Sequence, residues 1–496
     1  MIVMKFGGSS VATAARIKHV ASIVRAASGR QPVVVASALG DTTNQLVEIL
    51  AQARRGCTYP AWKLQKELKE YHFGISEELL SPEPLKEIDQ YLRTTFRDLH
   101  IQILEVAEEG RKLTPALTDE ILSLGEQIAS KIITSALKEA GIDALHLDAR
   151  DLILTDDNFT RATPRYWETY ARIRWTIPRA AASHVVVLGG FIGATENGQT
   201  TTLGRGGSDL TASIVGAGIN ADEIQIWKDV DGMLTCDPML KSDGYRVRSL
   251  SYQEAAELAQ AGAKILHPDT IAPAKRLRIP VVLRNTFRPE TEGTTIGVQA
   301  KPGAGIVKSI ACKLDVTLLE IRSPRSGVSV AECCHDLTEA CKKQKVTADL
   351  LGMSDESIYI ALDGREDHRE LSFSLDHCLE IRVRGHHAVL TLVGEGLNKS
   401  ADVLARVSGL LADAPVVVLP QDENSCSLRI VLPARDLLTY LDALHTAFFR
   451  DVDPLQFAYS TAPEPLMARR LRRANSASLP DRDFQTVTTS QLAFVK

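Results

Sequence analysis

The stretch KFGGSSV, at residues 5–11, stands between an apolar run, MIVM, and a helix-like run, ATAARIKHVASIVRAA. Glycines allow a tight turn and let a ligand approach the backbone closely. The first turn of a helix offers unpaired N–H groups and a partial positive charge. Together with Lys5, these features suggest a site for an anion, most simply a phosphate. An ordinary strand-to-helix turn with a surface lysine accounts for the stretch equally well, so the remaining sequence has to decide.

The composition is ordinary for a soluble protein of several domains. A chain of 496 residues predicts two to four domains. The net charge of −5 argues against a nucleic-acid partner, and no apolar run reaches the length of about eighteen residues that a membrane span needs. The eight cysteines are scattered without a Cys-x-x-Cys pair, and the N-terminus shows no signal pattern. We therefore expect reduced thiols in a cytoplasmic protein.

Short Val-rich strands alternate with amphipathic helices over residues 1–55, which predicts a parallel sheet covered on both faces. Residues 58–141 are instead rich in Leu, Glu, Lys and Ala at helical spacing, and we interpret them as a mostly helical insertion. The alternation then returns and ends near residue 297, ahead of the linker-like QAKPGAG. The first domain is therefore expected at residues 1–298.

Beyond the linker, two small α+β units with similar patterns follow in tandem, which indicates an internal duplication. The last forty residues carry a basic cluster, ARRLRRANS, and then polar sequence. We expect residues 458–496 to form a solvated, disordered tail.

A second glycine-rich stretch, GRGGSD at residues 204–209, also precedes a helix-like run. Its backbone predicts another anion cradle, and Arg205 is suited to a bidentate grip on a carboxylate. Asp209 taken alone is best explained as a helix cap. Beside an arginine and three glycines, a functional role is the better interpretation.

Two further stretches carry charged residues near turns. In WKDVDGMLTCDP, at residues 227–238, a strand ends at Lys228 and Asp229, where open α/β sheets bind ligands. In GAKILHPDT, at residues 262–270, Lys264 lies in a Gly/Ala setting. Polar turns and a surface lysine are the alternatives.

Other nucleotide-binding motifs are absent from the sequence. There is no P-loop, no protein-kinase H-R-D and D-F-G set, and no dinucleotide G-x-G-x-x-G at the first helix. Two anion cradles and two lysines favour phosphoryl transfer, in which positioning and charge neutralisation provide most of the catalysis.

The four motifs, in this order and followed by two small α+β repeats, resemble those of the aspartokinases of the amino-acid kinase family. The resemblance covers residues 1 to about 457. It implies an α/β fold: a parallel-sheet amino-acid kinase domain with a helical insertion, followed by two ACT-like domains. It also implies ATP- and Mg²⁺-dependent phosphorylation of the L-aspartate β-carboxylate to 4-phospho-L-aspartate, the entry to lysine, threonine and methionine synthesis. ACT-like domain 1 is expected at 314–380, inserted into domain 2 at 299–313 plus 381–457.

The resemblance also assigns roles to individual residues. Lys5 and Lys264 would neutralise charge on the transferred phosphoryl group, and Asp209 would orient them without acting as a base. Phosphates and nucleotide would be bound by Lys5, Gly7, Gly8, Ser9, Lys228, Asp229, Leu234, Met239, Lys264 and Ile265. Aspartate would be bound by Ser37, Thr43, Asn44, Glu126, Arg205, Gly206, Gly207 and Ser208. In these roles Arg205 clamps the α-carboxylate and Glu126 pairs with the ammonium, although helical periodicity alone places Glu126 on a solvated face.

The chain departs from the family pattern in two places. Leu234 and Met239 stand where many relatives carry tyrosine and arginine near the nucleotide, and the loop SPRSGVSVAECC of the first ACT-like unit is short. Asp349 and Ser354 match positions that hold an effector in lysine-regulated relatives. The resemblance thus implies a homodimer or larger assembly through the ACT-like units, with lysine as the leading effector.

Two other classes of protein remain open at this point. One is a kinase of the same fold that acts on acetylglutamate, glutamate or a nucleoside monophosphate, and the pair Arg205 and Glu126 argues against it. The other is a catalytically inactive amino-acid sensor, and the presence of Lys5, Lys264 and Asp209 argues against that.

Overall fold

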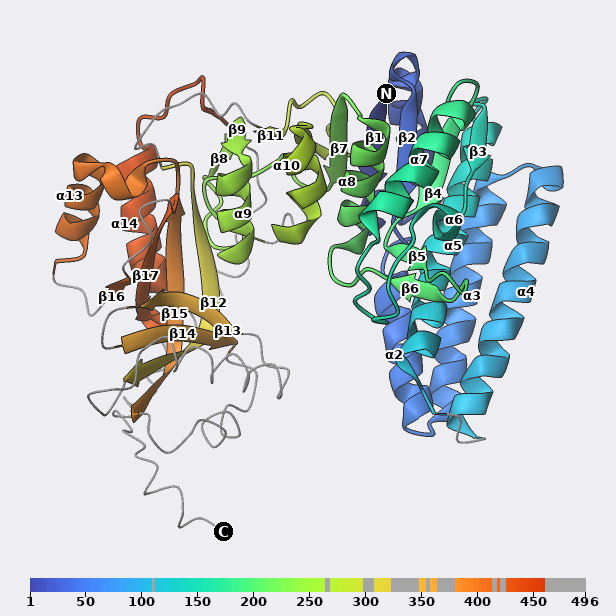
Figure 1. Ribbon diagram of the computed structural model, residues 1–496, viewed down its shortest axis with the longest axis horizontal. Coiled ribbons are helices and arrows are strands. Elements are labelled where there is room, and N and C mark those ends of the chain that lie inside the picture. Colours follow the sequence, from blue (N-terminus) through green and yellow to red (C-terminus); the bar gives the residue numbers. More distant parts are fainter. Residues whose placement is uncertain are drawn as a thin grey trace, which may run out of the picture. The chain divides into compact units, whose positions relative to one another are not determined.

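The computed structural model describes residues 1–108, 112–263, 268–297, 307–322, 348–353, 357–363, 380–412, 417–419 and 425–459 (Figure 1). The chain forms two compact units. The first consists of Met1–Met233, Arg248–Tyr252 and Leu266–Ala300, and the second of Leu234–Val247, Gln253–Ile265 and Lys301–Lys496. Two segments that precede the linker-like QAKPGAG thus belong to the second unit. The limits expected for the individual domains remain a prediction.

The first unit is built on an eight-stranded sheet with the order β3-β4-β2-β1-β7-β10-β11-β9. Its strands are β1 (Ile2–Phe6), β2 (Pro32–Ala36), β3 (Ala144–His146), β4 (Val185–Gly189), β7 (Glu223–Lys228), β9 (Ser249–Ser251), β10 (Val281–Asn285) and β11 (Thr294–Gly297). All neighbouring strands are parallel except β10 and β11. Every residue of β1, β2 and β4 is buried, as expected for parallel strands covered on both faces.

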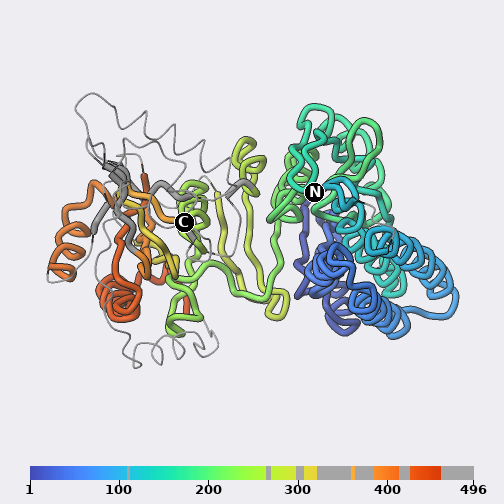
Figure 2. Tube along the Cα trace, turned by 90° about the horizontal axis from the view of Figure 1, so that it is seen from below, coloured from blue at the N-terminus to red at the C-terminus, as the bar shows by residue number. Residues whose placement is uncertain are grey.

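The helices of this unit include the predicted helical insertion. They are α1 (Ala14–Ala26), α2 (Thr42–Arg54), α3 (Thr58–Leu79), α4 (Pro82–Ala107), α5 (Pro115–Glu139), α6 (Ala149–Leu152), α7 (Tyr166–Ala180), α8 (Gly207–Ile219) and α10 (Ala272–Leu277). Figures 1 and 2 both show α3 and α4 lying side by side. A small hairpin, β5 (Ile192–Ala194) with β6 (Thr200–Thr202), completes the unit.

Local sequence explains how the site-bearing helices begin. The Thr114 side chain accepts a hydrogen bond from the Leu117 amide, and Pro115 occupies the first turn of α5, where no N–H is needed. Gly206, with φ of 75°, precedes α8 and supplies a left-handed backbone that other residues adopt at a cost. A 3-10 turn, Gly8–Val11, separates β1 from α1.

The second unit is built on a six-stranded antiparallel sheet with the order β13-β14-β12-β15-β17-β16. Its strands are β12 (Ser309–Arg322), β13 (Ala348–Met353), β14 (Ser357–Asp363), β15 (Glu380–Val393), β16 (Val417–Leu419) and β17 (Ser427–Pro433). The helices α9 (Tyr252–Gln260), α13 (Ala401–Leu410) and α14 (Leu437–Phe449) accompany it, and β8 (Tyr245–Val247) pairs with β18 (Phe457–Tyr459). One sheet therefore joins the strands of both α+β repeats, and the predicted fold class is confirmed.

Among the helices that the structure describes, none combines the length and the apolar character of a membrane span. Strand β18 includes the first two residues of the expected tail. The remaining tail, at 460–496, lies outside the described residues.

Candidate active site

Three charged side chains meet at the carboxyl edge of the first sheet. Lys5 comes from β1, Lys228 ends the neighbouring β7, and Asp209 lies in the first turn of α8. Lys5 Nζ is 2.6 Å from Asp209 Oδ1, and Lys228 Nζ is 3.1 Å from Asp209 Oδ2. Lys5 and Asp209 are 6% and 5% exposed, so this ion pair is largely shielded from water. The two predicted anion motifs therefore meet in space.

The electrostatics of this cluster keep Asp209 ionised. Burial acts to raise its pKa, but the charges of Lys5 and Lys228 outweigh burial and hold the pKa below its usual range. Burial lowers the pKa of Lys5, and the attraction of Asp209 opposes that change. Asp209 thus serves as a fixed negative charge that orients two ammonium groups.

The glycine-rich turn after β1 is held closely against a neighbouring loop. The N–H of Gly7 donates to the Trp227 carbonyl at 3.1 Å, and the N–H of Gly40 donates to the Gly8 carbonyl at 3.1 Å. The N–H group of Gly7 is therefore already hydrogen-bonded to β7. Within the described part of the chain, the N–H groups of Gly8 and Ser9 donate to no protein acceptor, which leaves them available to an anion.

A cavity of about 370 Å³ opens above the ion-paired cluster. Eight of the predicted site residues line it: Lys5, Thr43, Glu126, Arg205, Gly206, Gly207, Ser208 and Asp209. Residues from the start of the chain, from the helical insertion and from α8 thus converge on one space of substrate size.

Glu126 is buried in this cavity wall and does not lie on a solvated face, so periodicity alone gives the wrong position. Its side chain is 3% exposed, and its Oε2 atom has no hydrogen-bond partner in the described part of the chain. Burial raises its pKa to about 8, opposed by the Ala38 amide and by Lys5. An unpaired buried carboxyl group favours a cationic ligand.

A second cavity of about 250 Å³ is lined by Gly8, Ser37, Ala38, Gly40, Asp41, Thr43, Asn44 and Glu126. Thr43 and Glu126 line both cavities, so the two spaces are neighbours. The predicted acceptor loop with Ser37, Thr43 and Asn44 is therefore brought next to the glycine-rich turn.

Other predicted residues do not line these two cavities. Gly7, Ser9, Lys228 and Asp229 line neither of them, although Lys228 contacts the cavity residue Asp209. Leu234 and Met239 belong to the second compact unit, where the Leu234 carbonyl accepts a hydrogen bond from Ser309 Oγ at 2.7 Å.

The remaining predicted residues have no described side chains. Lys264, Ile265 and Ser354 lie outside the described residues. The backbone of Asp349 pairs with Ala361 in the second sheet, and its side chain is outside the description.

Five residues of the larger cavity are not among the predicted ones: Leu122, Thr160, Phe191, Thr202 and Gly204. Phe191 follows β4 after a glycine pair and has a φ of 66°, which is rare for an aromatic residue. A Cβ on Gly190 would lie 2.6 Å from Ser208 Cβ, so this glycine permits β4 to pack against the start of α8. The two consecutive glycines at the end of a buried strand are the sequence signal from which this loop could have been predicted as part of the site.

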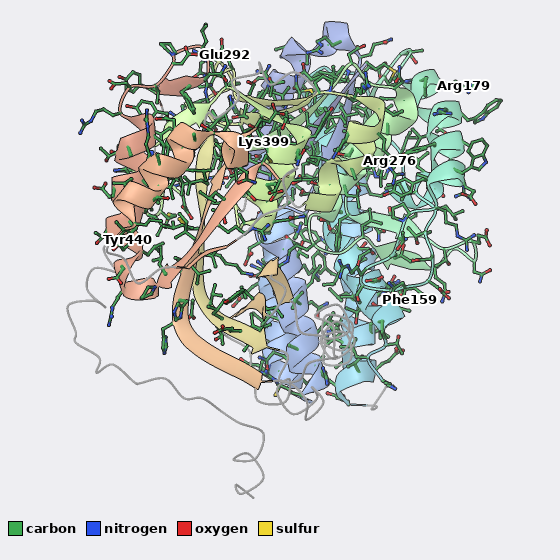
Figure 3. The ribbon with its side chains drawn as sticks, turned by 60° about the vertical axis from the view of Figure 1, so that its left-hand side comes forward. Phe159, Arg179, Arg276, Glu292, Lys399 and Tyr440 are labelled. Carbon is green, nitrogen blue, oxygen red and sulfur yellow. The ribbon has the colours of Figure 1, made fainter. Side chains whose placement is uncertain are left out.

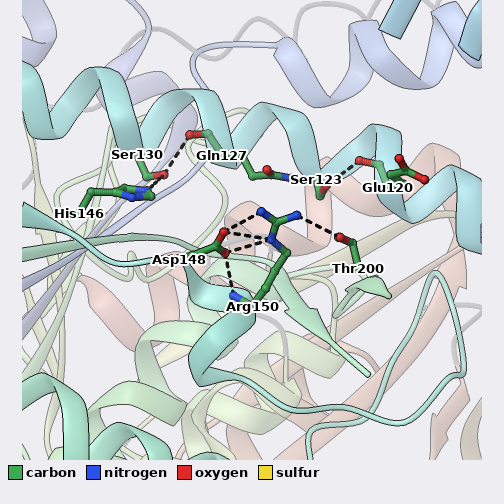
Figure 4. A network of polar contacts seen from close by, with 8 residues as sticks. All are labelled: Glu120, Ser123, Gln127, Ser130, His146, Asp148, Arg150 and Thr200. Atoms are coloured by element: carbon green, nitrogen blue, oxygen red, sulfur yellow. Dashed lines mark hydrogen bonds and ion pairs between the residues drawn. The ribbon is translucent and has the colours of Figure 1, made fainter. Parts of the chain in front are cut away.

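A polar network on α5 connects the helix that carries Glu126 with its surroundings (Figure 4). Ser130 Oγ contacts His146 Nε2 at 3.0 Å, and Gln127 Nε2 donates to Ser123 Oγ at 2.7 Å. Arg150 pairs with Asp148 at 2.6 Å. The contact between Ser130 and His146 therefore ties α5 to β3.

Comparisons with known proteins agree with this geometry. Residues 1–285 match the amino acid kinase family. The chain is 32% identical to aspartokinase 1, chloroplastic, of Arabidopsis thaliana over 472 residues, which cover 91% of this chain and 80% of the relative.

Solved structures of Escherichia coli aspartokinase III are also similar. The complex with aspartate and ADP has a TM-score of 0.78 and 28% identity, covering 90% of this chain and 100% of that one. The complex with lysine and aspartate has a TM-score of 0.74 and 27% identity, covering 90% and 99%. The family model spans more than half of the chain and the Arabidopsis relative matches most of both lengths, and so the chain belongs to the amino acid kinase family and, within it, to the aspartokinases.

Proposed function

We propose that the protein transfers the γ-phosphoryl group of ATP to the β-carboxylate of L-aspartate, giving 4-phospho-L-aspartate and ADP. One observation carries this assignment. The cavity joins a cationic floor at Lys5, beside Asp209, to a wall that holds both Arg205 and the buried Glu126. Phosphate and acceptor are both anions, so a cationic floor is needed to bring them together.

The acceptor end of the cavity suits a free α-amino acid. Arg205 offers a planar fork of donors for an α-carboxylate. Glu126 has a carboxylate oxygen without a hydrogen-bond partner in the described part of the chain. The ammonium group of an α-amino acid would supply that partner. The carboxylate that reacts is already ionised near neutral pH, so no general base is required.

The phosphate end is formed by the Lys5, Asp209 and Lys228 cluster together with the amides of Gly8 and Ser9. Lys264 is assigned to the same role by its motif alone. As the phosphoryl group leaves ADP, the lysines stabilise the charge on its oxygens, and Asp209 keeps their ammonium groups aimed at it.

The carboxylate at the phosphate end of the cavity is already paired, so Mg²⁺ would arrive with the nucleotide. Asp209 is the carboxylate at the cavity floor, and two lysines already pair with it. Phosphate oxygens, with waters, would therefore hold the ion, which is a common arrangement for Mg²⁺ in phosphoryl transfer. Bound there, the metal would neutralise charge on the nucleotide phosphates.

A coupled ADP-release assay with a panel of acceptors tests the proposed reaction. We expect turnover with L-aspartate that depends on Mg²⁺, and trapping of the acyl phosphate by hydroxylamine. L-glutamate and N-acetyl-L-glutamate should be poor acceptors, since the first is one methylene longer and the second lacks the ammonium group. Preference for either of these, or ADP release without a trapped acyl phosphate, contradicts the assignment.

We further propose that the C-terminal unit senses an end product, with lysine as the effector. The support is the similarity to a relative solved with lysine and aspartate, and the six-stranded sheet that joins both α+β repeats. Asp349 is the candidate partner for the effector ammonium. Separate titration of lysine, threonine and methionine into the assay tests this role. We expect inhibition by lysine at millimolar levels and its loss in Asp349→Ala, whereas lysine insensitivity of the wild type excludes it.

We also propose that the protein associates into a homodimer or larger assembly through this unit, as the resemblance of its two repeats to ACT domains implies. Light scattering of the purified protein measures its mass directly. A monomer at micromolar concentration, with and without lysine, contradicts this expectation.

The cysteines support the cytoplasm as the compartment. Those in the described part of the chain are free, and burial raises the pKa of the Cys236 and Cys426 thiols to about 12. Such thiols are inert at neutral pH, as expected of structural cysteines in a reducing compartment.

A further inference from the structure

Helix α5 carries a second buried carboxylate, two turns before Glu126. Asp119 is fully buried and lies seven positions before Glu126, so both side chains project from the same face of the helix. A buried carboxylate is unfavourable unless hydrogen bonds compensate for its lost hydration. Its partners therefore show what Asp119 holds in place.

Asp119 binds two segments that are distant from it in the sequence. Its Oδ2 atom accepts hydrogen bonds from the N–H of Thr160 at 2.8 Å and from the N–H of Thr202 at 2.9 Å. Its Oδ1 atom accepts one from the Thr202 hydroxyl at 2.6 Å. One carboxylate thus ties a loop and strand β6 to α5. Phe159, labelled in Figure 3, marks this loop.

The tied strand β6 ends at Thr202, three residues before Arg205, the proposed anchor of the substrate carboxylate. Thr160 and Thr202 line the larger cavity together with Glu126 and Arg205. A Cβ on Gly204 would lie 3.4 Å from the Thr160 carbonyl oxygen, so the loop packs directly against the residue before Arg205. Thr160 itself has a φ of 71°, a left-handed conformation that a threonine seldom adopts without support.

We propose that Asp119 is a positioning residue that sets the separation between Glu126 and Arg205, and thereby the length of the amino acid that the cavity accepts. Asp119 and Glu126 share one rigid helix, and Asp119 holds both strand β6, which leads to Arg205, and the loop that packs against Gly204. The proposal rests on the proposed aspartate kinase reaction, in which Glu126 and Arg205 bind the ammonium and the α-carboxylate.

The substitution Asp119→Asn tests this role. An asparagine oxygen can still accept from the N–H groups of Thr160 and Thr202, but it is neutral and therefore accepts more weakly than a carboxylate. Its NH₂ group faces the Thr202 hydroxyl, which then has to accept a hydrogen bond instead of donating one. We expect the KM for aspartate to rise about tenfold or more, while the KM for ATP stays within about twofold. The preference for aspartate over glutamate, measured as a ratio of kcat/KM values, should fall. Glu120→Gln is the matched control, because Glu120 is the next residue on α5, is exposed and contacts Gln102.

A second variant covers the case in which Asp119→Asn does not fold. Thr202→Val keeps the shape and the backbone N–H of Thr202 but removes the hydroxyl that donates to Asp119. It should raise the KM for aspartate in the same direction by a smaller factor, with the KM for ATP unchanged.

The outcomes separate this proposal from the one on which it rests. If the wild type does not phosphorylate aspartate, the proposed function fails. If the wild type does so and folded Asp119→Asn and Thr202→Val raise both KM values alike, or lower only kcat, Asp119 merely stabilises the fold and the positioning role is overturned.

Discussion

Lys5 Nζ and Asp209 Oδ1 are 2.6 Å apart, although the two residues belong to glycine-rich stretches that are far apart in the sequence. Both side chains are buried, and Asp209 also holds Lys228. This ion pair joins the two turn motifs at the floor of one cavity, where the role of each residue can be tested by substitution.

Lys5→Ala is expected to lower kcat strongly while the protein stays folded. Asp209 keeps Lys228 as a partner at 3.1 Å, so removing Lys5 does not leave an unpaired buried carboxylate. Loss of a group that stabilises transition-state charge typically costs about 3 kcal/mol, or roughly a hundredfold in kcat. Lys18→Ala, at an exposed lysine on α1, is the control for loss of a positive charge. Unchanged kcat in a folded Lys5→Ala protein refutes the assignment of this cluster to the phosphates.

Gly8→Ala and Gly7→Ala form a matched pair that tests the turn after β1. A Cβ on Gly8 would lie 2.7 Å from the Gly40 carbonyl oxygen and 3.0 Å from that of Ala38, and neither backbone atom can move easily. On Gly7 the nearest atom is the Trp227 oxygen at 3.6 Å, an ordinary contact. We expect Gly8→Ala to lose about 1–3 kcal/mol of stability and to raise the KM for ATP. Gly7→Ala should remain close to the wild type in Tm and in KM. Equal effects of the two substitutions contradict a close approach specific to Gly8.

The glycine-rich turns are the part of the site that can be predicted from the sequence alone. A turn between a strand and a helix is a local feature, so KFGGSSV and GRGGSD predict their own conformations: β1 ends at Phe6, and α8 begins at Gly207 with Asp209 in its first turn. That these turns lie together depends on α8 packing beside β1, a contact between distant parts of the sequence. Only the family resemblance implied it, by assigning both motifs to one active site.

Residues whose position depends on distant contacts were harder to predict. Helix α5 buries residues on more than one side, so its periodicity does not identify the face of Glu126. Thr160 and Thr202 reach the cavity through Asp119, a partner about forty and eighty residues away in the sequence. Local propensity carries no information on such contacts.

Arg205→Ala should raise the KM for aspartate far more than the KM for ATP. The side chain of Arg205 is exposed where the cavity opens, so its removal should leave the fold intact. A lost charge-assisted hydrogen bond corresponds to about 1.5–3 kcal/mol, or roughly a ten- to hundredfold rise in KM. Arg205→Lys should restore little, because a point charge does not reproduce the two parallel bonds of a guanidinium. If the KM for ATP rises more, Arg205 belongs to the phosphates.

The last prediction concerns the proton on Glu126. Burial raises the pKa of this carboxyl group to about 8, above its usual value, so the folded protein holds the proton that the unfolded chain loses at lower pH. The contribution of Glu126 to stability is therefore complete at low pH and is lost as the pH rises towards about 8. Binding of an ammonium group favours the charged carboxylate instead, so aspartate should displace the proton.

At pH 7 we expect aspartate binding to release close to one proton, measured by titration calorimetry in two buffers with different ionisation enthalpies. The KM for aspartate should fall by up to about tenfold per pH unit below pH 8 and level off above it. Glu126→Gln is the control, since it has the same shape and no proton to release; its aspartate binding should be weak and independent of pH over this range. Aspartate binding without proton release in the wild type, or the same pH dependence in Glu126→Gln, shows that Glu126 does not receive the ammonium group.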